Sequence, residues 1–403
     1  MTRPIPPSVF RLMHHGADRT PGAAPYGLAD HPTIDIYDEA IPGFVAAELE
    51  RLYENIYTTQ CRYTIYNEIA GASTYVKRSG GRVRAVFLFR RQGQVIKVLN
   101  KHIALGEVDL AELCAALFAH HRTARKIVFF ALQCQLRTLT LPHRQYWCQE
   151  DMVLRLPPSV PLYMAALGQK MRYNLRSCER KIMRDFPTFS FTNLDTTAAG
   201  EAAVRAIIAL AAARMARKGR PAYVNESETR RIVELVAAYG MVGLAWIDGQ
   251  ICGGQICYRV GNNFFMHIVA HDPRYDSHGL GTLILLYTFN ECIARGAREC
   301  SLMAGGNEYK TRFLAAPRDL HSVLVYRSAM QRWLDLGHIG LAARHYRRRV
   351  TWALLPLAKG KGRDQHGLAR WCAALERAMH ALGAVIGALA ARWRRVCNRP
   401  PPR

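Results

Sequence analysis

The chain has 403 residues, enough for two or three domains and a substantial hydrophobic core. Half of the residues are hydrophobic and 21% are charged, which excludes a disordered chain. Lysine and arginine outnumber aspartate and glutamate by 55 to 31, so the net charge of +24 favours anionic partners. A proteome that uses arginine heavily would account for the same excess.

The eleven cysteines are scattered along the chain, which favours reduced thiols. None forms a CxxC motif or pairs with histidines at zinc-ligand spacing, so the sequence predicts no metal site. The first twenty residues lack the apolar core of a signal peptide. No apolar run reaches the roughly 18–20 residues that span a bilayer. We therefore expect a cytoplasmic protein.

Residues 1–33 lack hydrophobic periodicity and predict a flexible N-terminal arm. The pattern over residues 34–158 predicts one helix, a meander of strands, a second helix and further strands. These elements are expected at Phe44–Tyr57 (helix), Arg62–Tyr66, Ser73–Lys77, Val83–Arg90, Gln94–Leu99 (strands), Asp109–His120 (helix, capped by its aspartate), Lys126–Leu132 and Asp151–Leu156 (strands).

A Pro157-Pro158 pair marks a boundary, and a basic segment follows it. Its cations are Lys170, Arg172, Arg176, Arg180, Lys181 and Arg184. This segment is interpreted either as an electropositive wall for a phosphorylated ligand or as a solvated helix face. Arg172 and Asn174 are its candidate substrate-binding residues. Two more helices are expected at 198–216 and 226–239.

Three apolar runs come next, at Met241–Ile247, Ile251–Val260 and Phe264–Val269. Asp248-Gly249 and Gly261-Asn262-Asn263 join them, which is the turn chemistry of antiparallel hairpins. A loop with two glycines follows and leads into an apolar-periodic helix that ends before Arg295-Gly296.

The glycine loop predicts a phosphate site, because backbone N–H groups at the start of a helix attract anions and glycine allows close approach. It follows an antiparallel meander rather than a parallel βαβ unit, which argues against a dinucleotide-binding fold and points to coenzyme A. The residues expected to hold the pyrophosphate are Ser277, His278, Gly279, Leu280, Gly281 and Thr282.

This stretch resembles the GNAT acyltransferase fold, in particular the CelD/BcsL-like branch linked to bacterial cellulose and exopolysaccharide synthesis. Members of that branch carry a segment close to YDP.Y...SPG, then a helix, then DEPYK.RF. This chain has His271-Asp272-Pro273-Arg274-Tyr275, then Ser277-His278-Gly279, then Tyr309-Lys310-Thr311-Arg312-Phe313. It departs at His278, where proline is usual, and at Gly306-Asn307-Glu308, which replaces Asp-Glu-Pro. The resemblance covers about residues 160–330.

The resemblance implies an α/β fold with tandem GNAT-like lobes, each a mostly antiparallel mixed sheet flanked by helices. Residues 34–158 would form a degenerate first lobe, residues 159–330 the acyltransferase lobe, and residues 331–403 a basic helical tail. Tandem lobes of this kind also resemble the Fem peptidyl transferases, which use aminoacyl-tRNA instead of an acyl-CoA.

The implied reaction is N-acyl transfer from acetyl-CoA or another acyl-CoA, or from an acyl carrier protein, without a metal. The acceptor would be an amine such as an amino sugar in a cell-surface polysaccharide, envelope or secondary-metabolite pathway. His267 is the candidate base, Glu308 the candidate acidic residue and Tyr309 the candidate proton donor to the thiolate. The candidate substrate contacts are Asp272, Lys310 and Arg312.

Two alternatives stay open beside this reading: a Fem-like transferase that depends on aminoacyl-tRNA, and a catalytically degenerate scaffold at the membrane. Residues 331–403 hold fifteen lysines and arginines against three acidic residues, which suits the anionic inner face of the cytoplasmic membrane. Packing of this tail on the protein body or on a second subunit fits the same pattern. No nucleic-acid motif or aromatic stacking platform is visible, which argues against a nucleic-acid partner.

Overall fold

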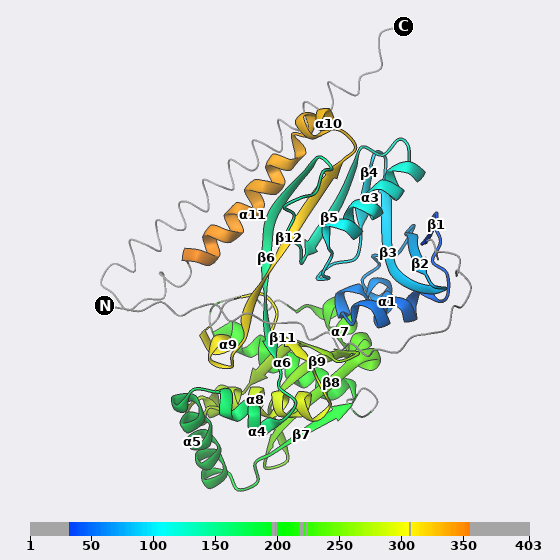
Figure 1. Ribbon diagram of the computed structural model, residues 1–403. Helices are drawn as coiled ribbons and strands as arrows, with labels where there is room; N and C mark the ends of the chain where they lie inside the picture. The colour runs from blue at the N-terminus through cyan, green and yellow to red at the C-terminus, as the bar shows by residue number, and fades with distance from the viewer. Residues whose placement is uncertain are drawn as a thin grey trace, which may run out of the picture.

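The computed structural model describes residues 32–354, apart from 196, 197, 199, 218, 220, 222, 223, 306 and 307. This part of the chain forms one twelve-stranded mixed sheet with helices on its faces (Figure 1). The strands are β1 (Thr33–Tyr37), β2 (Ser73–Ser79), β3 (Arg82–Gln92), β4 (Val95–Val98), β5 (Lys126–Leu132), β6 (His143–Arg155), β7 (Ser190–Asp195), β8 (Gly240–Ile247), β9 (Gln250–Val260), β10 (Asn263–His271), β11 (Glu299–Ser301) and β12 (Ala316–Tyr326).

The helices are α1 (Val45–Tyr53), α2 (Gln60–Ile65), α3 (Glu107–His120), α4 (Val160–Ala166), α5 (Gln169–Asp185), α6 (Glu201–Arg217), α7 (Glu226–Tyr239), α8 (Leu280–Ala294), α9 (Glu308–Arg312), α10 (Ala329–Leu334) and α11 (Gly337–Leu354). Two short 3₁₀ helices are η1 (Ile56–Thr58) and η2 (Pro273–His278). The predicted fold class is confirmed: an α/β protein whose sheet is mostly antiparallel and flanked by helices.

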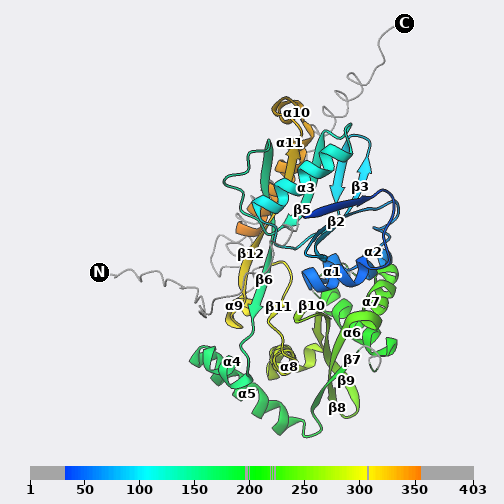
Figure 2. The same ribbon diagram turned by 45° about the vertical axis from the view of Figure 1, so that its right-hand side comes forward.

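The two lobes exchange strands across the middle of the sheet. The strand order is β1-β2-β3-β4-β5-β12-β6-β11-β10-β9-β8-β7. β12 follows the second lobe in sequence but pairs with β5 of the first, with Val323 opposite Phe129. β6 follows the first lobe but pairs with β11 of the second, with Leu154 opposite Cys300. Figures 1 and 2 show β6 and β12 as the long ribbons that connect the lobes.

Each lobe has its own apolar core against this sheet. In the first lobe, Leu113 and Leu117 of α3 pack against Phe89 and Phe129. In the second lobe, α8 covers one face, where Phe289 packs in the cluster of Phe264 and Met266. Helices α6 and α7 cover the opposite face, with Ile207 and Ile232 in the cluster of Ile268. Because α8 lies between the sheet and other helices, its sequence is apolar almost all round.

The strand predicted at Arg62–Tyr66 is wrong, since residues 62–65 belong to helix α2 and Tyr66 is its C-cap. The Thr59 side chain accepts a hydrogen bond from the backbone N–H of Arg62 and caps this helix. Tyr63 is fully buried on its inner face. The helix predicted over Phe44–Tyr57 ends at Tyr53, because Glu54 adopts a left-handed conformation with φ 42°.

Helix α3 begins two residues earlier than the helix predicted over Asp109–His120, and Asp109 does not cap it. Its N-cap is Gly106, which offers no side chain to bind the first N–H groups. Asp109 lies in the first turn, where its carboxylate is 3.6 Å from Lys77 Nζ.

Part of the predicted tail is described. Helix α11 packs along β6, and the Arg349 guanidinium lies 5.8 Å from the ring centroid of Trp147 (Figure 1). None of the helices in the described ranges is long and apolar enough to cross a membrane. Residues 1–31 of the predicted arm and the tail from residue 355 onward lie outside the described residues. Membrane association therefore stays a prediction.

Candidate active site

The second lobe opens between two parallel strands. β10 and β11 pair over only three residues, with Phe264 opposite Cys300 at the centre. β11 then ends at Ser301 while β10 continues to His271. The register of β10 against β9 also shifts between Met266 and Ile268, which makes His267 a bulge residue. Beyond residue 265, β10 therefore has a free edge towards the position that β11 has left.

The predicted base, His267, stands at this bulge. Its ring lies 5.3 Å from the ring of Tyr258, with Glu228 and Arg62 among its charged neighbours. Burial lowers the pKa of His267 to about 4, so the imidazole is neutral at pH 7 and keeps a free lone pair. The Tyr258 hydroxyl is buried and has no hydrogen-bond partner within the described ranges. This pair is chemically suited to proton transfer beside the open edge.

The predicted phosphate turn forms the start of α8. Gly279 has φ 67° and ψ 27°, and helix α8 begins at the next residue without a side-chain cap. The amides of Thr282 and Leu283 donate to the carbonyl of Gly279 at 2.9 and 3.1 Å. The amides of Leu280 and Gly281 have no acceptor in the part of the chain that the structure describes. Two N–H groups are thus available to an anion at the positive end of a buried helix.

The basic helix α5 lies directly against this turn. Lys181 Nζ donates to the carbonyl of Ser277 at 3.0 Å, and the His278 ring is 3.1 Å from an Asp185 carboxylate oxygen. A Cβ on Gly279 would lie 2.4 Å from the sulfur of Cys178 on the same helix. The interpretation of α5 as a positive wall is therefore compatible with its position, because it brings cations to the phosphate turn.

Two residues predicted to bind substrate are engaged in local structure. Arg172 donates through Nη1 to the carbonyls of Ala165 and Leu167, and so ties α5 to the end of α4. Asp272 accepts from the backbone N–H of Arg274 at 2.9 Å and pairs with its guanidinium at 2.7 Å. Arg274 accordingly holds the pKa of Asp272 below its usual range. Asn174 lies exposed on α5. Substrate contacts by these three residues stay predictions.

Helix α9 carries three more predicted residues on the protein surface. Glu308 is exposed and pairs with Arg312, four residues on. Tyr309 is 41% exposed, and burial of its hydroxyl raises its pKa, with Arg214 opposing the shift. Tyr309 therefore keeps its proton at neutral pH, and its role as proton donor to the thiolate stays a prediction.

Lys310 differs from its neighbours on α9 because it is only 3% exposed. Its ammonium donates to the carbonyls of Met303 and Ala304 at 3.0 Å each. Burial lowers its pKa to about 8, while Asp151 and Glu150 oppose the shift. The lysine thus fixes the segment that leaves β11 and shapes the edge of the opening. Its predicted contact with substrate stays untested.

Residues from the first half of the chain complete this region, and no sequence signal pointed to them. The Tyr57 hydroxyl donates to the sulfur of Met303 at 2.6 Å, and its ring stacks on His102 at 4.2 Å. Asp151 on β6 is buried and accepts from the Ser301 hydroxyl at 2.6 Å. The two hydrogen bonds join positions 246 and 150 residues apart, so local pattern could not reveal them.

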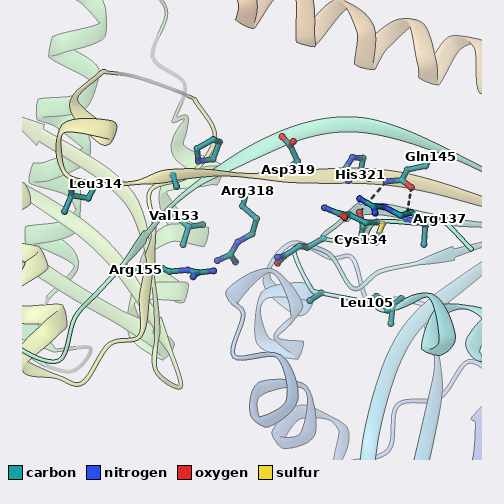
Figure 3. A pocket seen from close by; sticks show the side chains of 17 residues that line it. Leu105, Cys134, Arg137, Gln145, Val153, Arg155, Leu314, Arg318, Asp319 and His321 are labelled. Carbon is teal, nitrogen blue, oxygen red and sulfur yellow. Dashed lines mark hydrogen bonds between the residues drawn. The ribbon is translucent and has the colours of Figure 1, made fainter. Parts of the chain in front are cut away.

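A cleft between the lobes adjoins the opening. Its larger cavity, of about 1110 Å³, lies between β6 and β12 and the loops of the first lobe, and Arg155 and Arg318 project into it (Figure 3). A smaller cavity of about 280 Å³ shares Arg318 with it and is also lined by Phe265 and Ser301. The cleft therefore extends to the point where β10 and β11 separate.

Guanidinium groups dominate the charge of this cleft. Arg318 pairs with Glu299 through two hydrogen bonds of 3.0 and 2.5 Å. The side chains of Arg137 and Arg155 have no hydrogen-bond partner among residues 32–354 as far as these are described. Two unpaired guanidinium groups facing a cavity can bind phosphate or carboxylate oxygens.

Comparisons with known proteins agree with this geometry. The family model described as "Acetyltransferase (GNAT) domain" matches residues 169–311. The crystal structure of FemX matches with a TM-score of 0.55 at 8% identity, over 75% of this chain and 99% of FemX. L-PGS from Bacillus licheniformis matches with a TM-score of 0.48 at 12% identity, over 77% of this chain and 99% of that one. No curated protein matches the chain.

Residues 169–311 thus match the model of a GNAT acetyltransferase domain, and about 75% of the chain shares the fold of FemX. The predicted resemblance is confirmed at the level of a GNAT/Fem-like fold. Membership of the CelD/BcsL-like branch stays a prediction.

Proposed function

We propose that the protein is an N-acyltransferase that moves an acyl group from an acyl-CoA thioester to an amine. The observation that carries this proposal is the pairing of two features in one lobe. β10 and β11 separate at the His267 bulge, and the glycine turn of α8 follows β10 after the short helix η2. In this arrangement the pantetheine thioester of an acyl-CoA would lie along the free edge of β10. Its pyrophosphate would accept hydrogen bonds from the amides of Leu280 and Gly281.

The reaction needs little covalent chemistry from the protein. The amine nitrogen attacks the thioester carbonyl carbon, the C–S bond breaks, and the amine gives up a proton while the thiolate accepts one. Neutral His267 takes the amine proton in this proposal. Tyr258 or Tyr309 supplies the proton for the thiolate, and a backbone N–H on the free edge of β10 polarises the carbonyl.

The cleft between the lobes is the proposed acceptor site. Its unpaired Arg137 and Arg155 side chains suit an amine that carries an anionic group, such as an amino sugar on a lipid or nucleotide phosphate. Acceptors of this kind belong to cell-surface polysaccharide, envelope or secondary-metabolite pathways. This assignment is compatible with the implied CelD/BcsL-like branch.

Calorimetric titration of the full chain with acetyl-CoA and with a long-chain acyl-CoA tests the proposal. We expect micromolar binding of at least one of them, and the preferred chain length would narrow the pathway. If neither binds, the acyl-CoA assignment is wrong. Activity that requires charged tRNA and is removed by ribonuclease would then identify an aminoacyl-tRNA donor.

Replacing Arg155 with alanine is expected to raise the KM for an anionic acceptor about 10- to 100-fold and to change kcat less than about threefold. A charge-assisted hydrogen bond contributes about 1.5–3 kcal/mol, and this one would be made equally in the ground state and the transition state. Steady-state kinetics measure the effect. Arg84→Ala is the matched control, because Arg84 is exposed on β3 outside the cleft. An unchanged KM in the Arg155 variant would remove the cleft from the acceptor site.

A further inference from the structure

Three side chains with metal-binding atoms meet at one end of the first lobe. Asp38 lies in the turn after β1, His120 is the last residue of α3, and His121 follows it. One ligand atom from each residue lies within 4.8 Å of the other two. An Asp38 oxygen is 2.7 Å from His120 Nε2, and the other is 3.5 Å from His121 Nε2. Figure 1 shows this end of the sheet in the opposite lobe from α8.

His121 carries the signal that this cluster binds something. It is only 7% exposed, yet its Nε2 atom has no hydrogen-bond partner in the described ranges. Its ring is held against Phe89 at 5.6 Å and against His120 at 4.7 Å. Buried polar atoms in folded proteins nearly always have a hydrogen-bond or metal partner. The His121 Nε2 atom lies near the Asp38 carboxylate without such a hydrogen bond, which indicates that a ligand is bound there in the functional protein.

Hydrogen bonds of the His121 main chain fix the position of this residue before any ligand binds. The N–H of His121 donates to the carbonyl of Leu117 at 2.9 Å. Its carbonyl accepts from the N–H of Ala124 at 2.9 Å and from Arg327 Nη2 at 2.8 Å. Arg327 follows β12, so the central part of the sheet anchors the end of α3. These hydrogen bonds hold the main chain at residue 121 in place before any metal binds.

We propose that Asp38, His120 and His121 form a zinc site. Bonds of about 2.0–2.2 Å in a tetrahedral arrangement place neighbouring ligand atoms about 3.4 Å apart. One ligand atom from each of the three residues already lies within 4.8 Å of the other two. Two imidazoles and one carboxylate suit Zn²⁺, whereas Mg²⁺ and Ca²⁺ prefer oxygen ligands only. With three protein ligands, the fourth position belongs to water. The site joins the turn after the edge strand β1 to the end of α3.

Cobalt titration of the chelator-treated full chain, followed by absorption, tests the site because Co²⁺ substitutes for Zn²⁺ and is coloured. We expect one Co²⁺ per chain at this site, visible d–d bands without a thiolate charge-transfer band, displacement by Zn²⁺ and no displacement by Mg²⁺. Zinc should also raise the melting temperature by several degrees at saturation. Asp38→Asn and His120→Ala should each weaken metal binding at least tenfold and abolish the zinc-dependent melting shift.

A matched control is available in the same chain, because His14 and His15 are also adjacent. The double variant His14→Ala/His15→Ala should bind Co²⁺ at the proposed site as the unmodified protein does. The His120 side chain is 40% exposed, so His120→Ala should keep the metal-free melting temperature within a few degrees. Absence of binding by the unmodified protein, a thiolate charge-transfer band, or unchanged affinity in both Asp38→Asn and His120→Ala would overturn the proposal.

Discussion

Replacement of Gly281 by leucine is expected to weaken acyl-CoA binding at least 100-fold, which corresponds to about 2.7 kcal/mol. A Cβ at this position would lie 2.7 Å from the His271 imidazole, whose Nε2 is 2.8 Å from an Asp276 carboxylate oxygen. A leucine must therefore displace His271 or move the first turn of α8. Either change removes the amides of Leu280 and Gly281 from the positions where they would meet a pyrophosphate, and the side chain also fills that space.

Calorimetry with acetyl-CoA or the preferred acyl-CoA measures this loss, and Gly340→Leu is its control. Gly340 is also helical, in α11, but a Cβ there meets nothing within 4 Å. The control should bind the coenzyme as the unmodified protein does, whereas the smaller change Gly281→Ala should lose about tenfold. A folded Gly281→Leu protein with unchanged affinity would show that the turn does not hold phosphate.

Local chemistry explains what the sequence could predict of this region. Asp248 and Gly249 both have positive φ, at 51° and 73°, as a tight hairpin turn requires. Gly279 has the left-handed conformation expected where a strand gives way to a helix without a side-chain cap. Each of these signals lies within a few residues of the structure that it specifies. The hairpins, the glycine turn and helix α8 were therefore predictable.

The rest depends on contacts that no local pattern encodes. Residues 62–66 read as a strand because tyrosine, threonine and isoleucine favour sheets, yet the Thr59 cap and the burial of Tyr63 select a helix. The pairing of β12 with β5 joins residues almost 200 positions apart. Asp38 meets His120 across 82 positions, which a search for metal ligands at fixed spacing cannot find. Tertiary structure decides each of these cases.

Two half-buried histidines, His102 and His267, lead to a second large expected effect, a loss of stability in mild acid. Burial lowers the pKa of His102 to about 3, and the cations Lys101, Arg62 and Arg318 contribute to the shift. The Gln149 amide donates to His102 Nε2 at 2.8 Å, so protonation of that atom would also break a hydrogen bond. His267 has a pKa of about 4, chiefly because of burial, with Glu228 opposing and Arg62 adding to the shift.

The direction of the change in stability with pH follows from the number of protons that each state binds. In the unfolded chain both histidines titrate near 6.5, so between pH 6.5 and about 4 the unfolded state binds protons that the folded state does not. The free energy of unfolding therefore falls as the pH falls through this window. Between pH 7 and pH 4.5 each histidine should lower the free energy of unfolding by about 2–3 kcal/mol. This is a large fraction of the stability of an ordinary domain.

Urea unfolding at pH 7 and pH 4.5 measures this effect in the unmodified protein and in His102→Asn and His267→Gln. Asparagine is chosen at position 102 because it tolerates the left-handed conformation found there, φ 60°. Each variant should lose about 2–3 kcal/mol less than the unmodified protein on acidification. An equal loss in all three proteins would mean that neither histidine is held neutral in the folded state.

The same shift constrains catalysis if His267 is the base. Its neutral form would persist down to about pH 4, so activity should not fall at pH 6.5, where an ordinary histidine gains its proton. Activity should fall only where acid also begins to unfold the protein, because one protonation would inactivate the base and destabilise the lobe around it. A pH–rate profile with its acidic limb near 6.5, in a protein that stays folded there, would assign the base to another group.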